Sequence, residues 1–188
     1  MKFPTATAIF LATTCGAIAD EFTDALERFL EAEVVGWADN PRLVEAINEQ
    51  NSVTVGYDQA RIDELDRMWQ SEIGQSETPT ITPVLENPLS AYLRDTVNGS
   101  DGRILEVIVM DARGLNVAAS AATSDFWQGD EAKFTETYAR GAGSTHVSDV
   151  EFDESTQSYQ GQISMTIVDP TTGDAIGAVT FGVDPQAL

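Results

Sequence analysis

The sequence has little of three kinds of residue on which many binding and catalytic sites depend. Its 188 residues include one cysteine and one histidine, and 10 lysines and arginines face 31 aspartates and glutamates, so the formal net charge is −21. So few positive charges cannot form a phosphate-neutralising surface, which excludes nucleic acid as a partner. The same charge disfavours anionic lipids and polyanionic substrates, and it favours small cationic or amphoteric ligands.

The shortage of cysteine and histidine also limits catalysis. The sequence has no Gly-x-Ser-x-Gly nucleophile motif and no phosphate-binding glycine loop, and Gly141-Ala142-Gly143 is interpreted as a helix stop. No motif supplies a partner that would orient His146 as a general base. We therefore predict that the protein is not an enzyme and needs no cofactor. A secreted enzyme of unrecognised type is the alternative.

The chain also lacks a run of about 18 apolar residues, the length needed to span a membrane. It begins instead with the positive Lys2, a shorter apolar run at 3–14, and the small-x-small sequence Ala17-Ile18-Ala19. We interpret residues 1–19 as a secretory signal peptide cleaved after Ala19. The mature protein is then expected to be periplasmic or secreted, without insertion into the membrane.

Cys15 allows a second interpretation of the same region. A lipoprotein anchor would use this cysteine, although Thr14 stands where a small Gly, Ala or Ser should precede it. If the leader is removed, the mature domain has no cysteine and cannot contain a disulfide or a cysteine-ligated metal.

Residues 20–98 show the apolar spacing of three and four residues that is typical of amphipathic helices. The spacing continues from Phe22 to Trp37, and Asn40-Pro41 can cap and open a second segment, so we predict one long, bent helix. A polar stretch at 49–52 is expected to end it.

Two shorter helices are expected before residue 99. The spacing predicts a helix over 57–73, and Asn87-Pro88 is a typical start for another. Between them, residues 78–83 contain two prolines and are expected to form an extended connector.

The pattern changes to strands after residue 102. β-Branched and apolar residues predict a hairpin with arms at 104–110 and 115–120, joined by a tight turn at 111–114. After a loop at 123–129, Asp130 is placed to cap a helix of about ten residues. Three further strands are expected, at 144–151, 159–168 and 175–183.

This order of elements predicts an α+β domain. Connections between strands are short except for the one that carries a helix, so we expect one five-stranded antiparallel sheet. The long N-terminal helix should pack on one face, and a loop-helix lid at 123–138 should roof a cavity on the other. Residues 20–98 and 99–188 would then form one domain, with the cavity as a natural small-molecule site.

One acidic cluster suggests a different function. Asp149, Glu151 and Asp153 alternate, so on one strand their side chains would project to the same side and could coordinate a hard cation such as calcium. The spacing lacks the glycine and terminal glutamate of a calcium loop. A solvated acidic edge that discourages pairing between sheets explains the cluster equally simply.

Several segments, in their order, resemble the Cache superfamily of PAS-like extracellular sensor domains. They are the Asp111-Ala112-Arg113-Gly114 turn, the Gly-Asp-Glu-Ala-Lys-Phe segment at 129–134, the Asp-Pro-Thr-Thr-Gly turn at 169–173 and the closing strand at 176–184. The match covers about residues 103–184, and the long helix before it is also typical of the family.

The resemblance implies a sensor domain whose ligand lies between the sheet and the lid. In amino-acid-binding relatives, an arginine at the position of Lys133 holds the ligand carboxylate, aromatic residues after it shape the pocket, and an aspartate matching Asp184 holds the amine. Here Lys133 replaces the arginine and cannot bind a carboxylate in the same bidentate way, and the aromatic pair is reduced to Phe134.

Other residues complete the candidate site. Asp125 and Trp127 offer a carboxylate and an aromatic face, a combination that suits an amine. On the strand at 159–168, Gln162 shares a face with Ser164 and not with Tyr159. Caps, core positions and solvated surface remain the alternative roles of these residues. The predicted ligand-binding set is Asp125, Phe126, Trp127, Lys133, Phe134, Tyr138, His146, Gln162, Ser164 and Asp184.

The sequence thus predicts an exported sensor that binds an amine, an amino acid or a small carboxylate. Because the chain shows no output domain, a signal is expected to pass to a membrane-bound partner. The long N-terminal helix could serve as a docking or dimerisation surface, or it could simply cover the core.

Overall fold

The computed structural model describes residues 15–153 and 158–188. Most of the predicted leader lies outside the described residues, and residues 15–19 begin the first helix, α1 (Cys15–Phe29). Among the described helices, none has both the length and the apolar character needed to cross a membrane.

The predicted long, bent helix is present in several pieces. From α1 the chain passes through a π-helical turn and a 3-10 turn, and then enters α2 (Pro41–Thr54), which Asn40 caps by accepting a hydrogen bond from the Arg42 N–H at 3.0 Å. The expected break at 49–52 is wrong, because Asn51 in this stretch donates to the Ile176 carbonyl and accepts from the Ala112 N–H, which keeps it helical against the sheet.

The next helices bring one further correction. Helices α3 (Gln59–Glu72) and α5 (Pro88–Asn98) are present as predicted. The segment at 78–83 is not extended throughout, since it enters the short helix α4 (Ile81–Leu85). Pro83 is tolerated there because it lies in the first turn, where no intrahelical bond needs its missing N–H.

The sheet is antiparallel, and its main strands run in the order β2-β1-β6-β5-β3. The predicted hairpin and the two long C-terminal strands are confirmed, and Gly114 closes the hairpin turn with a φ of 79°. The strand bounds are β1 (Ile104–Met110), β2 (Asn116–Ala119), β3 (Thr145–Val147), β5 (Ser158–Val168) and β6 (Ala175–Val183).

The strand predicted at 144–151 is divided. After β3, the chain leaves the ladder and returns as β4 (Glu151–Asp153), which pairs with the first part of β5. At the break, the Ser148 hydroxyl accepts the Gln162 N–H at 2.9 Å, so a side chain replaces part of the backbone ladder.

The lid helix is also shorter than predicted. Helix α6 (Ala132–Thr135) begins after Glu131, not after Asp130, and a separate 3-10 turn covers 138–140. Between them, Thr137 has φ −116° and ψ −90°, and its hydroxyl donates to the Lys133 carbonyl. This local hydrogen bond ends the helix in place of a continued ladder.

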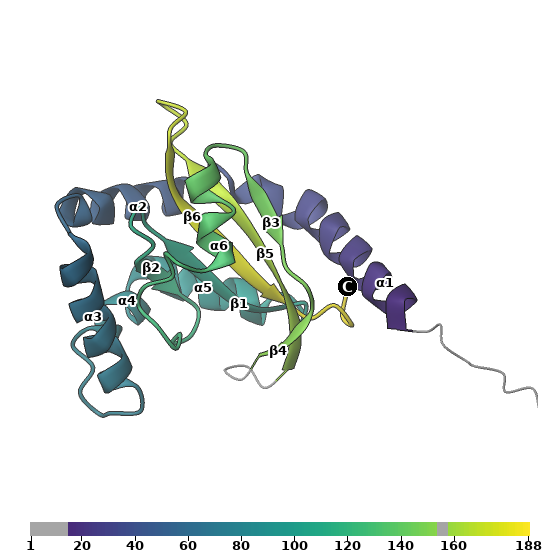
Figure 1. Ribbon diagram of the computed structural model, residues 1–188, viewed down its shortest axis with the longest axis horizontal. Coiled ribbons are helices and arrows are strands. Elements are labelled where there is room, and N and C mark those ends of the chain that lie inside the picture. The colour runs from purple at the N-terminus through teal and green to yellow at the C-terminus, as the bar shows by residue number, and fades with distance from the viewer. Residues whose placement is uncertain (1–14, 154–157) are drawn as a thin grey trace, which may run out of the picture.

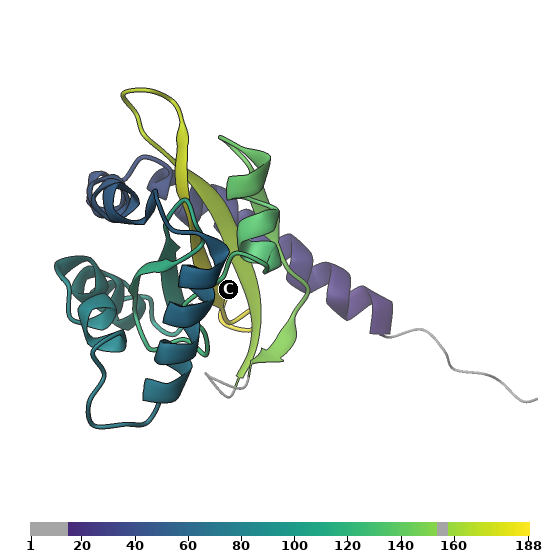
Figure 2. The same ribbon diagram turned by 60° about the vertical axis from the view of Figure 1, so that its left-hand side comes forward.

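The two faces of the sheet are covered differently (Figures 1 and 2). Residues from α1, α2 and α5 pack with one face of the sheet in the main core, which includes Leu26, Leu43 and Leu93. On the other face, Phe134 of α6 packs on Ile108 and Met110. The predicted α+β class, with a helical layer on one face and a lid on the other, is confirmed.

Candidate functional site

The face of the sheet beneath α6 changes from apolar to polar along its length. Since side chains alternate along a strand, the even-numbered residues at 106–110 of β1, 160–166 of β5 and 178–182 of β6 point to this face, whereas Ile104 and Ile176, beyond shifts in the register, pack with the main core. At one end, Phe134 and Tyr138 stack with ring centroids 5.0 Å apart over Ile108 and Ala178. The other end carries the polar side chains of Glu106, Gln160 and Gln162.

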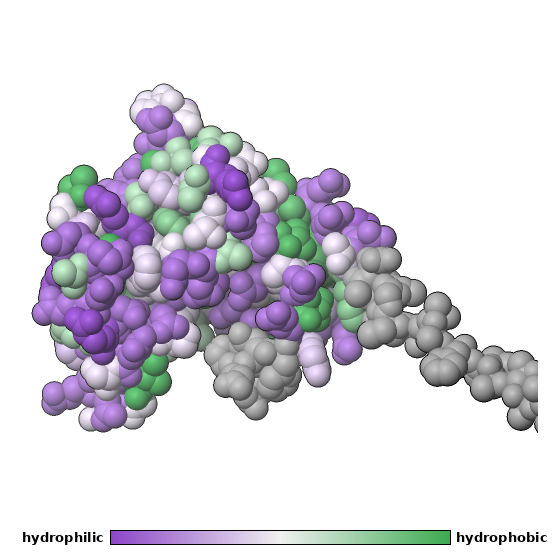
Figure 3. Space-filling view, in the orientation of Figure 1, coloured by the Kyte–Doolittle hydropathy of each residue, from purple (hydrophilic) through white to green (hydrophobic). Residues whose placement is uncertain are grey.

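A cavity of about 440 Å³ lies at this polar end, and we call it the lid cavity. Its walls come from the start of α6, the edge strands β3 and β4, and β5. Figure 3 shows this face of the molecule, on which hydrophilic residues predominate. The lining residues are Glu131, Ala132, Lys133, His146, Val147, Ser148, Asp149, Glu151, Gln160 and Gln162.

Lys133 is buried in the cavity wall, with 7% of its surface exposed. Its ammonium lies 3.0 Å from the Glu131 carboxylate and donates to the Gln128 side-chain oxygen at 3.0 Å. Two of its three N–H donors are therefore used within the protein.

Gln160 holds an unused acceptor at the same cavity. It is 3% exposed, and its amide nitrogen donates to a Glu106 carboxylate oxygen at 3.3 Å. Its own side-chain oxygen has no hydrogen-bond partner among the described residues. A buried acceptor without a partner is unfavourable unless a ligand or water donates to it.

Gly182 makes room for this pair of side chains. A Cβ built on Gly182 would lie 2.7 Å from both the Gln160 amide oxygen and the Glu106 Cγ, so a larger residue there would displace them. The glycine therefore keeps the floor of the cavity open to polar groups.

A second cavity, of about 730 Å³, lies among the helices between α2, α4 and the β2 edge. Several polar groups in its wall are used by the fold, and the wall also carries the charged residues Arg42, Glu45 and Glu49. Gln50 donates to the Asp111 carboxylate at 3.1 Å, Thr54 donates to it at 2.8 Å, and the Asn87 amide donates to backbone carbonyls. The rest of the wall is mostly apolar, with Val53, Leu65, Val84, Leu115 and Phe126 among its residues.

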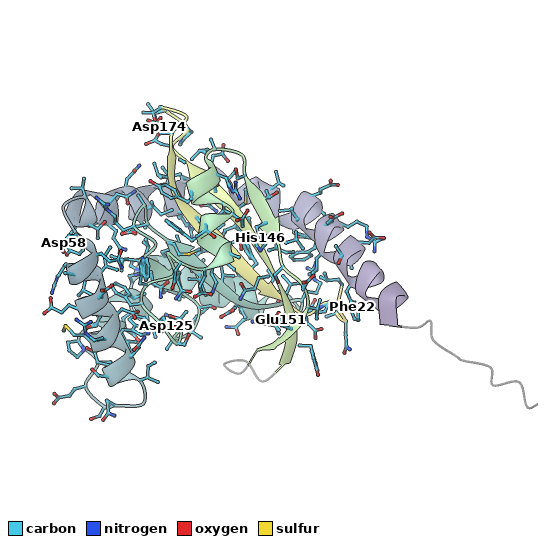
Figure 4. All side chains as sticks on the ribbon, viewed as in Figure 1. Phe22, Asp58, Asp125, His146, Glu151 and Asp174 are labelled. Carbon is cyan, nitrogen blue, oxygen red and sulfur yellow. The ribbon has the colours of Figure 1, made fainter. Side chains whose placement is uncertain are left out.

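The predicted site residues of the 123–129 loop do not line the lid cavity. Asp125 accepts a hydrogen bond from the Gln70 amide at 2.6 Å and lies beside α3 (Figure 4). Phe126 stacks on Trp69 with centroids 5.3 Å apart, and Trp127 donates its indole N–H to the Arg113 carbonyl at 2.8 Å. These residues attach the loop to the helices.

The other predicted residues divide in the same way. Lys133, His146 and Gln162 meet in the lid cavity. Ser164 is fully buried and accepts from Thr180 at 3.0 Å, and Asp184 accepts from the Gln186 N–H beyond the end of β6, so neither lines it. Phe134 and Tyr138 form the apolar end of the lid.

The acids proposed as cation ligands are separated by the break in the strand. Asp149 lies between β3 and β4, whereas Glu151 lies on β4; both line the lid cavity. The side chain of Asp153 lies outside the described residues. Within the described part of the chain, no group of three or more potential metal ligands is assembled.

Sequence reasoning missed Glu131, Ser148 and Gln160. For Gln160 a signal was available, since Gln160, Gln162 and Ser164 alternate and must share one face. No comparable signal marked Ser148, because its place depends on the break between β3 and β4.

Comparisons with known proteins give structural matches only. No protein-family model and no curated protein matches the sequence. Similar solved structures include the E. coli DcuS sensor domain, at 13% identity and TM-score 0.46, with 89% of this chain and 93% of that one covered. The sensor domain of the V. cholerae histidine kinase DctB matches at 14% and 0.39, covering 92% and 58%.

A third match is the ligand-binding domain of the Pseudomonas aeruginosa PAO1 amino acid chemoreceptor PctC in complex with GABA, at 16% identity and TM-score 0.39, covering 89% of this chain and 58% of that one. This chain therefore spans less than two thirds of the DctB and PctC structures. These three structures are described as sensor or ligand-binding domains. A likeness of this degree concerns the fold and does not identify the ligand.

Proposed function

We propose that this protein is an exported sensor domain that binds a small organic molecule in the lid cavity. The observation that carries the proposal is that Gln160 lines the same cavity as Lys133, His146 and Gln162 and has a buried side-chain oxygen with no hydrogen-bond partner in the described part of the chain. A few polar groups that converge on an enclosed space are typical of small-molecule sites. An amine, an amino acid or a small carboxylate fits a cavity of about 440 Å³.

The larger cavity among the helices is a weaker candidate. Its amides and hydroxyls donate to Asp111 and to backbone carbonyls, as described above, so they hold the hairpin and α5 in place. Both cavities contain charged groups, and we favour the lid cavity because it is also lined by Gln160, whose buried oxygen has no partner among the described residues.

Export and signalling belong to the same proposal. Cleavage after Ala19 would release the domain into the periplasm or the medium. Binding would then be communicated to a membrane-bound sensor partner. The lid is the element best placed to respond, since α6 supplies both Lys133 to the cavity and Phe134 to the apolar contact with the sheet.

A pair of tryptophan substitutions on the lid tests where the ligand binds. Ala132 is exposed and lines the cavity, so Ala132→Trp should fill its mouth, whereas Ala139 is exposed on the lid without lining the cavity. Amines, amino acids and small carboxylates would be screened by thermal shift. A ligand at 100 times its dissociation constant stabilises the protein by about 2.7 kcal/mol.

We expect Ala132→Trp to abolish this stabilisation and Ala139→Trp to retain it. If no compound of the three classes stabilises the protein, or if hits stabilise both variants equally, the lid cavity is not the binding site.

A further inference from the structure

We propose that the lid cavity selects an organic cation, an amine or a guanidinium compound without a carboxylate. This inference rests on the proposed function and narrows it to one class of ligand. It also differs from what the family resemblance implies, because there the position of Lys133 serves to hold a ligand carboxylate.

The first reason is the charge of the cavity wall. Three carboxylates, those of Glu131, Asp149 and Glu151, line the cavity together with the single ammonium of Lys133, so these four groups carry a formal charge of −2. Neither Asp149 nor Glu151 has an ion-pair partner among the residues that the structure describes. The whole chain adds its own negative field, with a net charge of −21. A cation is drawn into such a site and an anion is repelled.

The second reason is that Lys133 is already neutralised. Its ammonium is held between the Glu131 carboxylate and the Gln128 oxygen, at 3.0 Å from each. A ligand carboxylate would have to compete with Glu131 for this ammonium, and it would do so next to two further carboxylates. Lys133 therefore holds the wall together and is a poor anion receptor.

The third reason is the direction of the Gln160 amide. The amide nitrogen donates to the Glu106 carboxylate, and a rotated amide would place its oxygen against the carboxylate instead. Glu106 thus fixes Gln160 so that its oxygen, which is buried beside Gly182 at the cavity floor, is the group without a partner among the described residues. An oxygen acceptor suits an N–H donor, and a hydrogen bond from a charged donor is stronger than one from a neutral donor.

Together these groups describe a site with two parts. Gln160 provides a buried acceptor at the floor, and Asp149 and Glu151 provide negative charge at the exposed rim. A primary ammonium or a guanidinium group carries several N–H donors and can use both parts at once.

The test uses three probes with the same five-carbon chain: pentylamine, 5-aminopentanoate and glutarate. Their binding to the purified protein would be measured by calorimetry at low and high salt. We expect pentylamine to bind at least about tenfold more tightly than 5-aminopentanoate. The affinity for pentylamine should fall as the salt concentration rises, and glutarate should not bind. Tighter binding of glutarate or of the zwitterion would overturn the cation proposal. It would leave the proposed function standing if Ala132→Trp still blocked binding.

Two substitutions test the named groups. Gln160→Met removes the acceptor while keeping a similar shape, and should weaken pentylamine by about tenfold. Glu151→Gln removes a negative charge at the exposed rim of the cavity, so the affinity for pentylamine should fall by a few-fold and much of its salt dependence should disappear. Glu77→Gln, at an exposed position outside the cavity, is the control and should leave the affinity unchanged. If both Gln160→Met and Glu151→Gln bind pentylamine as tightly as the wild-type protein, these residues do not form the cation site and the proposal is refuted.

Lys133→Met tests whether the lysine pairs with Glu131 or holds a ligand carboxylate, because the two roles predict opposite changes in ligand affinity. Removing the ammonium frees Glu131, so pentylamine should bind as tightly as before or more tightly. If Lys133 instead holds a ligand carboxylate, this variant should lose binding of 5-aminopentanoate or glutarate, and its affinity for pentylamine should not increase.

Discussion

A buried carboxylate at the end of α3 provides the sharpest test of how the helical layer is held. Glu72 is 7% exposed, and its Oε2 accepts the backbone N–H groups of Thr80 at 2.8 Å and Ile81 at 3.0 Å, at the start of α4. Burial alone would raise the pKa of Glu72, but the hydrogen bonds from Ile81 and Thr80 outweigh it and hold the pKa below its ordinary value.

The substitution Glu72→Gln keeps the shape of the side chain and removes its charge. A hydrogen bond to a charged acceptor contributes about 1.5–3 kcal/mol, against about 0.5–1.5 kcal/mol for a neutral one. With two bonds affected, and with the easier burial of an amide partly offsetting the loss, we expect the variant to be about 1–2 kcal/mol less stable at pH 7. The melting temperature should fall by about 2–8 °C.

The dependence on pH has a defined sign. A carboxyl group whose pKa is lowered by folding stabilises the native state above its unfolded pKa, and this stabilisation is lost as the pH falls through the folded pKa. The difference between the wild-type protein and Glu72→Gln should therefore be full at pH 7 and shrink below the ordinary value of 4.5.

Urea unfolding followed by tryptophan fluorescence suits this measurement, because Trp69 lies in the same helix and is fully buried. Glu77→Gln, in the exposed loop that follows, is the matched control and should leave the stability unchanged. Our reasoning fails if Glu72→Gln is as stable as the wild type at pH 7, or if the difference between them grows in acid.

Three further substitutions test other parts of the packing. Gly177→Ala would place a Cβ against the Met110 carbonyl oxygen, so urea unfolding should show a loss of about 1–3 kcal/mol. Asp111→Asn replaces a fully buried carboxylate that accepts four hydrogen bonds, and calorimetry should show a loss of about 1–3 kcal/mol. Trp69→Phe keeps the aromatic stack but removes the bond to the Thr123 carbonyl, so hydrogen exchange should speed up in α3 at a loss of about 1 kcal/mol.

The main features of the fold could be predicted because they depend on local signals. The alternating and apolar residues of β1, β5 and β6 specify strands, and the Asn-Pro pairs at 40–41 and 87–88 specify helix starts that the structure confirms through their side-chain caps. The errors lie where tertiary contacts decide. The polar stretch at 49–52 stays helical because its amides reach Asp111 and the Ile176 carbonyl, which are distant in sequence.

The loop at 123–129 shows the same limit for function. Its aspartate and aromatic residues have the chemistry of an amine site, and we included them in the candidate ligand site on the basis of residue type. In the structure, Trp69 stacks on Phe126, and Asp66 accepts the N–H groups of Phe126 and Trp127 at 2.8 and 3.0 Å. These contacts come from α3, whose position against the loop no sequence spacing specifies.

The start of α6 shows how a shift of one or two residues changes the chemistry of a site. In a helix, residues two apart lie about 200° apart around the axis, so a helix that included Glu131 would direct Glu131 and Lys133 to different sides. In the structure Glu131 precedes the helix, with extended angles of φ −88° and ψ 154°, and its carboxylate reaches the Lys133 ammonium. The helix boundary thus changes Lys133 from a free anion-binding group into part of a neutral pair. The negative charge of Asp149 and Glu151 is then left to decide which ligand the cavity attracts.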